Sequence, residues 1–155
     1  MEERVTTILG MIQDELQQLE QLGAVLQKEH LALQRRDTSA LNSATSEKDK
    51  LVAALRSRGR ARMELLITMG VATDQQSIQC YVASMPQLME SWQMLERSLL
   101  ECQKQNQING MLLEKGRKQT QSLLALFLGD QMRKAETYDA RGYTSSLFNG
   151  RSVRV

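Results

Sequence analysis

The chain has 155 residues and a formal net charge of +2, and 41% of its residues are hydrophobic although only six are aromatic. Its 23 Leu, 17 Gln and nine Met, with a single proline, make helix formers common and strand formers scarce, so an all-α fold is expected. The longest uninterrupted apolar run has six residues, far below the roughly 20 of a membrane-spanning helix, which argues against membrane insertion.

The first residues of the chain indicate its compartment, and its two cysteines and one histidine decide what is expected of disulfides and metal sites. The chain starts with acidic residues where a secretory signal has a basic one, and no apolar stretch follows, so a cytoplasmic protein is expected. A disulfide between Cys80 and Cys102 is not expected in a reducing compartment. Together with His30 they are too few N and S donors for a four-ligand zinc site, so neither a metal nor a cofactor is predicted.

Apolar residues in the first part of the chain recur four and three residues apart, which is the spacing of a heptad seam. The pattern predicts a helix over residues 2–34 whose seam contains Val5, Leu9, Ile12, Leu16, Leu19, Gly23, Leu26, His30 and Leu33. The lone His30 is interpreted as a partly buried structural residue, because no second histidine accompanies it as a metal ligand.

A polar segment then separates the first helix from a second one, predicted over residues 38–69. Asp37 or Thr38 is suited to cap its start, and Gly70 is placed to end it. The link between these two helices is short, so they are expected to be antiparallel neighbours.

A short helix is predicted over residues 75–83, and Pro86 favours a break before the next helix. The third long helix is predicted over residues 86–129, ending at Gly129, with residues 130–136 as frayed helix. Its heptad seam reads Leu88, Trp92, Leu95, Leu99, Cys102, Asn106, Asn109, Leu113, Gly116, Thr120, Leu123 and Phe127. Because the seam continues beyond Asn109-Gly110, this turn-forming dipeptide is not expected to break the helix.

Three long amphipathic helices with short links can bury their seams only against one another. We therefore predict an elongated antiparallel bundle over residues 1–136, with the short helix between the second and third long helices, and a flexible tail over residues 137–155. The second half of the third helix has four non-apolar seam positions and is predicted to be poorly sealed. Its widened apolar stripe fits two readings, a core that faces two neighbours or a groove for a partner's amphipathic helix.

Three segments of the chain resemble motifs of one known family. Residues 106–114, Asn-Gln-Ile-Asn-Gly-Met-Leu-Leu-Glu, resemble the NxxNGxLLE-like signature in the third helix of the FlgN family, whose members are flagellar export chaperones. Residues 47–55 are similar to an EKxxLLxxL stretch of its second helix, and residues 137–142 to its tail motif, ahead of a basic C-terminus with Arg151 and Arg154.

The resemblance implies a non-enzymatic cytosolic chaperone. Such a protein binds C-terminal amphipathic helices of hook-filament junction (hook-associated) proteins, prevents their premature assembly and delivers them to the flagellar type III export apparatus. Tyr138 stands where the family's tail tyrosine is associated with docking at the export gate. The client-binding residues that we expect are Asn106, Asn109, Gly110, Leu112, Leu113, Gly116, Thr120, Leu123, Leu124 and Phe127.

Other classes of function remain to be weighed against the chaperone. The arginines between residues 56 and 62 suggest nucleic acid, but alternate residues of a helix point about 200° apart, so they spread around the axis, and no nucleic-acid binding is expected. No acid-base pair, phosphate loop or nucleophile constellation is recognisable, so an enzyme is not predicted. The alternative is a structural coiled-coil protein that self-associates through its imperfect seams, and a client-free homo-oligomer is compatible with both.

Overall fold

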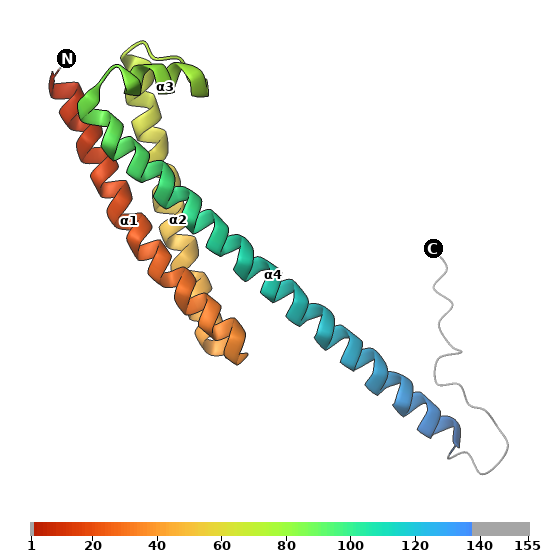
Figure 1. Ribbon diagram of the computed structural model, residues 1–155. Helices are drawn as coiled ribbons and strands as arrows, with labels where there is room; N and C mark the ends of the chain where they lie inside the picture. Colours follow the sequence, from red (N-terminus) through yellow and green to blue (C-terminus); the bar gives the residue numbers. More distant parts are fainter. Residues whose placement is uncertain (1, 138–155) are drawn as a thin grey trace. The chain divides into compact units, whose positions relative to one another are not determined.

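The computed structural model describes the backbone of residues 2–137 and the side chains of residues 2–126 and 128. This part of the chain contains helices and no strand (Figure 1), which confirms the prediction of an all-α protein. The helices are α1 (Glu2–Arg35), α2 (Thr38–Thr68), α3 (Gln75–Ala83) and α4 (Pro86–Thr137). None of them, over the residues described, is both long and apolar enough to cross a membrane.

Local side-chain chemistry explains where α2 and α3 begin. Asp37 caps α2 by accepting a hydrogen bond from the backbone N–H of Ala40 at 3.0 Å. Asp74 caps α3 in the same way, with Ser77 N as the donor at 2.8 Å. Both bonds satisfy backbone donors that the first turn of a helix leaves unpaired, and Asp37 is one of the two caps that the sequence offered for α2.

Backbone conformation explains where α1 and α2 end. Arg36, which follows α1, has φ 55°, and Gly70, which follows the cap of α2, has φ 83°. Both lie in the left-handed region, where the chain leaves a helix, and glycine adopts it without a steric cost. The prediction that Gly70 ends the second helix is therefore confirmed.

The prediction that Gly129 ends the last long helix was wrong, because α4 continues through it to Thr137. A glycine inside a helix costs only about 0.5–1 kcal/mol relative to alanine. The residues after Gly129 include Gln131, Met132, Lys134 and Ala135, which are good helix formers and offset that cost. The segment 130–136 is therefore part of α4, and α4 also passes through Asn109-Gly110 without a break, as its heptads predicted.

The chain divides into two compact units, Met1–Leu112 and a second one that begins at Leu113. We call them the N-terminal unit and the C-terminal unit, and α4 contributes to both. The N-terminal unit holds the hydrophobic core, to which all four helices contribute: Val5, Ile8, Ile12, Leu19, Leu22, Leu26, Leu66, Val82, Leu88, Trp92 and Leu95.

Contacts within the N-terminal unit give the directions of its helices. Lys28 of α1 pairs with Glu47 of α2 at 3.6 Å, whereas Asp14 of α1 pairs with Arg58 of α2 at 2.7 Å. Residue numbers rise along one helix as they fall along the other, so α1 and α2, which lie side by side in Figure 1, are antiparallel.

The first part of α4 runs in the same direction as α1. Cys102 contacts the carbonyl of Leu19, and Asn109 contacts the carbonyl of Leu26. Both contacts join residues 83 apart in the sequence, so the two helices advance together. Three long segments therefore enclose the core of the N-terminal unit.

Four of the nine positions of the heptad seam predicted for α1 are buried, and the last predicted position, Leu33, is only half-buried beside buried Ala32. Val5, Ile12, Leu19 and Leu26 are buried as predicted. Between them, however, the buried positions are Ile8, Glu15, Leu22 and Glu29, each one residue before the predicted Leu9, Leu16, Gly23 and His30. The prediction spaced the seam four and then three residues from Val5, whereas the buried positions are spaced three and then four, and two of them are glutamates.

Candidate functional site

Asn109 is the most deeply buried of the residues predicted to bind a client, at 1% exposed. Its Nδ2 donates hydrogen bonds to the carbonyl of Leu26 at 2.9 Å and to Glu29 Oε2 at 2.8 Å. Its Oδ1 accepts from His30 Nδ1 at 3.1 Å and from Gln105 Nε2 at 3.0 Å. An amide side chain has two donors and two acceptor positions, so the Asn109 amide is fully satisfied within the chain.

His30 contributes to this layer as a structural residue. The Asn109 oxygen can only accept, so the hydrogen-bond network assigns the imidazole proton to Nδ1 of His30. Nε2 then accepts from Gln34 Nε2 at 3.0 Å. Both ring nitrogens are used, and the half-buried ring fits the expectation of a structural histidine.

Glu29 links the same layer to α2. It is 5% exposed and accepts a hydrogen bond of 2.6 Å from Lys48 Nζ. Lys48 also donates to Asn106 Oδ1 at 3.2 Å, although Asn106 itself is exposed. We call Glu29, His30, Lys48, Asn106 and Asn109 the Asn109 layer; it joins α1, α2 and α4.

A second polar layer lies nearer the start of α1 and consists of Glu15, Arg62 and Trp92. Arg62 donates from Nε to Glu15 Oε1 at 2.7 Å and from Nη2 to Glu15 Oε2 at 3.3 Å. Its guanidinium carbon lies 4.7 Å from the centre of the Trp92 ring, within range of a cation–π interaction. We call this set the Arg62 layer.

The two layers have the same spacing on each of the three helices. Glu15 and Glu29 are 14 residues apart on α1, and Arg62 and Lys48 are 14 apart on α2. On α4 the corresponding pair is Trp92 and Asn106, again 14 apart. Two heptads therefore separate the layers, a distance of about 21 Å at 1.5 Å per residue.

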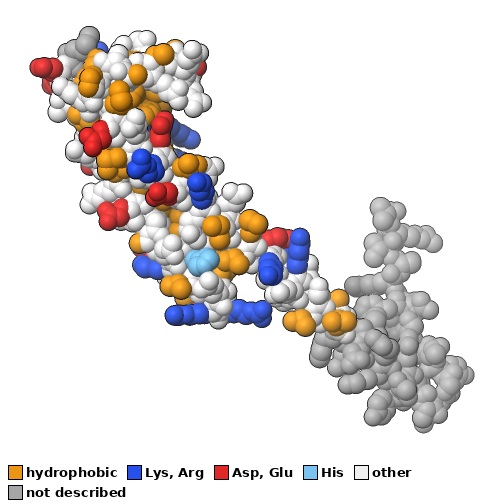
Figure 2. Space-filling model, viewed as in Figure 1, with side chains coloured by type: hydrophobic (Ala, Val, Ile, Leu, Met, Phe, Trp, Pro, Cys, Tyr) orange, Lys and Arg blue, Asp and Glu red, His pale blue; other side chains and the backbone are white. Residues whose placement is uncertain are grey.

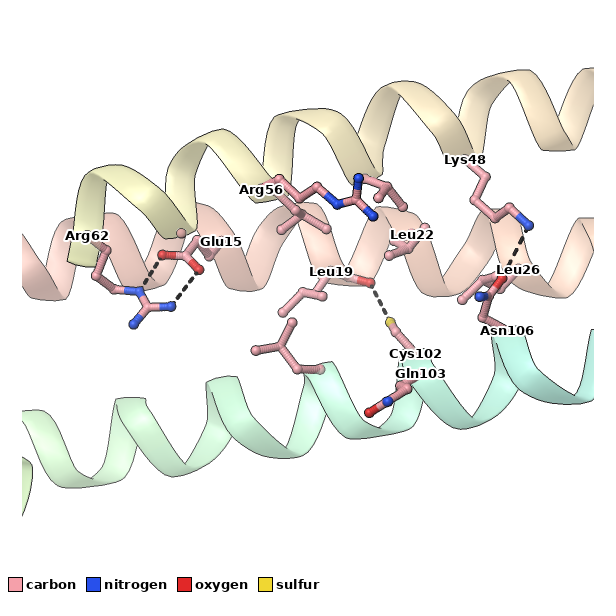
Figure 3. Close-up of a pocket in the computed structure, with 14 residues that line it drawn as sticks. Glu15, Leu19, Leu22, Leu26, Lys48, Arg56, Arg62, Cys102, Gln103 and Asn106 are labelled. Carbon is pink, nitrogen blue, oxygen red and sulfur yellow. Dashed lines mark hydrogen bonds and ion pairs between the residues drawn. The ribbon is translucent and has the colours of Figure 1, made fainter. Parts of the chain in front are cut away.

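A groove with a volume of about 410 Å³ lies between the two layers (Figure 3). Its surface is mostly apolar, and all three long helices contribute to it. The apolar lining residues are Leu19, Leu22 and Leu26 of α1, Val52 and Leu55 of α2, and Leu99 and Cys102 of α4.

The charged residues around the groove are predominantly basic. Lys48, Arg56 and Arg62 line it, against one carboxylate, that of Glu15. Lys48 and Arg62 have the ion-pair partners described above, whereas exposed Arg56 has none among the residues that the structure describes (Figure 3). The groove therefore presents an uncompensated positive charge.

Cys102 places a thiol in the groove. Its Sγ lies 3.6 Å from the carbonyl oxygen of Leu19, to which it donates a weak hydrogen bond. Burial raises the pKa of the Cys102 thiol, and the negative charge of Glu101 raises that pKa further. Cys102 is thus held as the neutral thiol.

The C-terminal unit has a different surface. The side chains described from Leu113 onward are all exposed, and hydrophobic ones are visible there in Figure 2. Five leucines are more than half exposed, namely Leu113, Leu123, Leu124, Leu126 and Leu128; we call them the leucine set. Exposed apolar side chains in such number commonly mark a binding surface.

Polar residues of the C-terminal unit interact locally. Arg117 donates two hydrogen bonds to Glu114, at 3.0 Å and 2.8 Å, and they hold the pKa of that carboxyl below its usual value. The Thr120 hydroxyl donates to the carbonyl of Gly116 at 3.0 Å. Both interactions stay within one or two turns of the helix.

The predicted client-binding residues are divided between the two units. Asn106, Asn109, Gly110 and Leu112 belong to the N-terminal unit, and among them only Asn109 is fully buried. Leu113, Gly116, Thr120, Leu123 and Leu124 belong to the C-terminal unit and are exposed. The Phe127 side chain, Tyr138 and the predicted tail from residue 138 onward lie outside the described residues, whereas Thr137, predicted as the first residue of the tail, is the last residue of α4.

Sequence reasoning did not single out Glu15 and Glu29, which anchor the two layers. The signal that identifies them is their register, because they continue the seven-residue spacing of Ile8 and Leu22. Among the described residues, no three His, Cys, Asp or Glu side chains are grouped so as to hold a metal ion. The polar layers connect helices through hydrogen bonds and ion pairs.

A comparison with models of protein families identifies the family of the chain. The family model described as FlgN protein matches residues 1–146, which is nearly the whole chain. The chain therefore belongs to the FlgN family, a family of flagellar chaperones. No curated protein and no solved structure matches it.

Proposed function

We propose that this member of the FlgN family is a cytosolic, non-enzymatic export chaperone for hook-filament junction proteins. It binds their C-terminal amphipathic helices, prevents their premature assembly and delivers them to the flagellar type III export apparatus. The observation that carries the proposal, beyond family membership, is the leucine set of the C-terminal unit.

A client helix gives the leucine set an apolar partner. A single amphipathic helix in water gains little from propensity alone and is stabilised mainly by burying its apolar face. Leu113, Leu123 and Leu124 leave such a face exposed. Two client helices laid against this exposed face would form a bundle with it, in the way that many amphipathic helices bind an apolar groove of their partner.

Gly116 and Thr120 suit close packing of a client helix. A Cβ placed at Gly116 meets nothing within 4 Å, and the Thr120 hydroxyl is satisfied by its own helix. Small side chains among large ones leave recesses for a partner's side chains. In this proposal Asn109 has a different task, since its bonds to α1 fix the register of α4.

The same leucine set favours a second candidate function, a structural protein that self-associates. Leu126 and Leu128, which are 69% and 54% exposed, would be covered equally well by a second copy of the chain. Binding of a client helix decides between the candidates. A chaperone forms a complex with its client, whereas a structural coiled coil assembles without one.

The test uses the purified full-length chain and a synthetic C-terminal helix of a hook-filament junction protein. We expect a size shift and a dissociation constant below tens of micromolar, which corresponds to about −6 kcal/mol or stronger. The variant Leu113→Asp/Leu123→Asp should lose this binding, because it places two charges among apolar contacts. A wild-type chain that binds no such helix, yet forms stable oligomers by sedimentation, contradicts the chaperone proposal.

The tail is tested separately. We propose Tyr138 as the residue that docks at the export gate, so Tyr138→Ala should keep the affinity for the client and reduce its secretion. A variant truncated after Gly129 should also keep the affinity. If truncation abolishes client binding, the division of tasks between helix and tail is wrong.

A further inference from the structure

We propose that the groove between the Asn109 layer and the Arg62 layer is a docking site for an acidic amphipathic helix of another protein. This site lies wholly in the N-terminal unit and differs from the leucine set. It does not depend on the client-binding proposal, and it assigns a task to Arg56 of α2.

The shape of the groove fits the apolar side of a helix. Its ends are defined by two layers about 21 Å apart, which corresponds to four turns of an α-helix. Leu19, Leu22 and Leu26 follow one another along its floor. A partner helix that carries leucine-sized residues at positions i, i+3, i+4 and i+7 presents anchors at the same spacing.

The groove requires no polar partner at its ends. At one end Glu15 and Arg62 satisfy each other, and at the other end Glu29 holds Lys48. A helix that enters the groove therefore meets neutralised ends and an apolar middle. Specificity for one partner helix over another must then come from the charged residues at the edge of the groove, which we call its rim.

Arg56 supplies that charge. It lies between the two layers on α2, lines the groove and has no ion-pair partner in the described part of the chain. Arg60, one turn further on, is likewise exposed, and no ion pair joins it to another described residue. A carboxylate beside the partner's apolar residues gains a charge-assisted hydrogen bond, whereas a lysine there is repelled.

Charge also argues against this chain's own helix as the occupant. The charged residues at the start of the C-terminal unit are one acid, Glu114, and three bases, Lys115, Arg117 and Lys118. A second copy that laid this segment into the groove would bring like charges to Arg56. The occupant that fits is therefore acidic and comes from a different protein.

The probe is a pair of designed 18-residue amphipathic peptides with the same leucine pattern. One carries glutamate and the other carries lysine at the positions that flank the apolar face. Cys102 is the reporter, because it lines the groove and a bound helix covers it. The full-length chain is used with Cys80→Ser, which removes the exposed second thiol, and alkylation of Cys102 is followed by mass spectrometry.

Two variants and one control test the proposal. Gly59 lines the groove, and a Cβ at that position meets nothing within 4 Å, so Gly59→Leu is expected to fold and to obstruct the groove. Arg56→Glu reverses the charge of the rim. Lys50→Glu makes the same change at an exposed lysine of α2 that does not line the groove.

We expect the glutamate peptide to slow alkylation of Cys102 at least tenfold and the lysine peptide to have little effect. Gly59→Leu should abolish protection, Arg56→Glu should make the lysine peptide the better protector, and Lys50→Glu should behave as the parent. Equal protection by both peptides, or protection by the glutamate peptide that survives Arg56→Glu, overturns the proposal. Absence of protection by either peptide in the parent chain overturns it as well.

Discussion

Glu29 of α1 and Asn109 of α4 are joined by a hydrogen bond of 2.8 Å in the interior of the N-terminal unit, where they are 5% and 1% exposed. Lys48 of α2 balances the carboxylate charge at 2.6 Å. A buried charge is tolerated only when it is paired and hydrogen-bonded, so these three side chains depend on one another. The position of α4 along α1 depends on the same contacts.

Asn109→Leu should destabilise the N-terminal unit by about 1–3 kcal/mol, because the Glu29 carboxylate and the Leu26 carbonyl each lose the hydrogen bond that Asn109 donates. The matched variant is Asn106→Leu, at an exposed asparagine one turn earlier that interacts only with Lys48 in the described part of the chain. Its cost should stay below about 1 kcal/mol. Urea unfolding followed by circular dichroism measures both, and equal costs would contradict the importance of the Asn109 bonds.

Glu15→Leu should destabilise the chain by about 3 kcal/mol or more, since it leaves the nearly buried Arg62 guanidinium without its counter-charge. The double variant Glu15→Leu/Arg62→Leu should recover most of that loss, because two apolar side chains replace two charges. The control pair is Asp14 and Arg58, which joins the same helices at the surface. Asp14→Ala should cost at most about 1 kcal/mol. A double variant that is less stable than Glu15→Leu alone would contradict this account.

Gly59→Ala should stabilise the chain by about 0.5–1 kcal/mol, because the helix interior gains an alanine and the added Cβ meets no neighbour within 4 Å. Gly70→Ala should do the opposite. Its added Cβ also meets open space, but φ at this position is 83°, which strains any residue with a side chain. The midpoint of thermal unfolding compares the two, and a shift of the same sign in both would show that backbone conformation is not the deciding factor.

The reactivity of Cys102 should depend on pH in a defined direction. Burial and the charge of Glu101 raise the pKa of this thiol, so its reactive thiolate appears at higher pH than that of a free cysteine. The alkylation rate measured against pH should therefore rise later in the folded chain than in the chain unfolded in urea. Because the unfolded thiol ionises first, the same shift predicts a loss of stability as pH rises from the ordinary cysteine pKa through the raised one. Coincident profiles would contradict the half-buried position of the Cys102 thiol.

Much of the secondary structure was predictable because it depends on local chemistry. Asp37 and Asp74 cap helices, and Gly70 supplies a left-handed backbone, whatever the distant parts of the chain do. The end of α4 was less predictable. A single Gly129 carries a small cost that the helix formers after it outweigh.

Only part of the candidate site was predictable from the sequence, because burial of its polar residues depends on hydrogen-bond and ion-pair partners from other helices. Asn106 and Asn109 attract attention in the sequence as two amides of one seam, yet the sequence does not say that one faces α1 and the other solvent. Glu15 and Glu29 occupy buried positions that an apolar pattern assigns to their neighbours. A glutamate is buried only where a cation reaches it, and Arg62 and Lys48 come from another helix.

The sequence by itself determined an all-α chain, its helices and caps, and the apolar residues of α4 that a partner can cover. Heptad spacing and capping act over a few residues, so they can be read directly. Only the tertiary structure decided which face of each helix is buried, because burial of Glu15 and Glu29 depends on ion pairs between α1 and α2. The groove between the two polar layers likewise exists only once three helices are aligned, since each contributes one wall and none encloses a space alone.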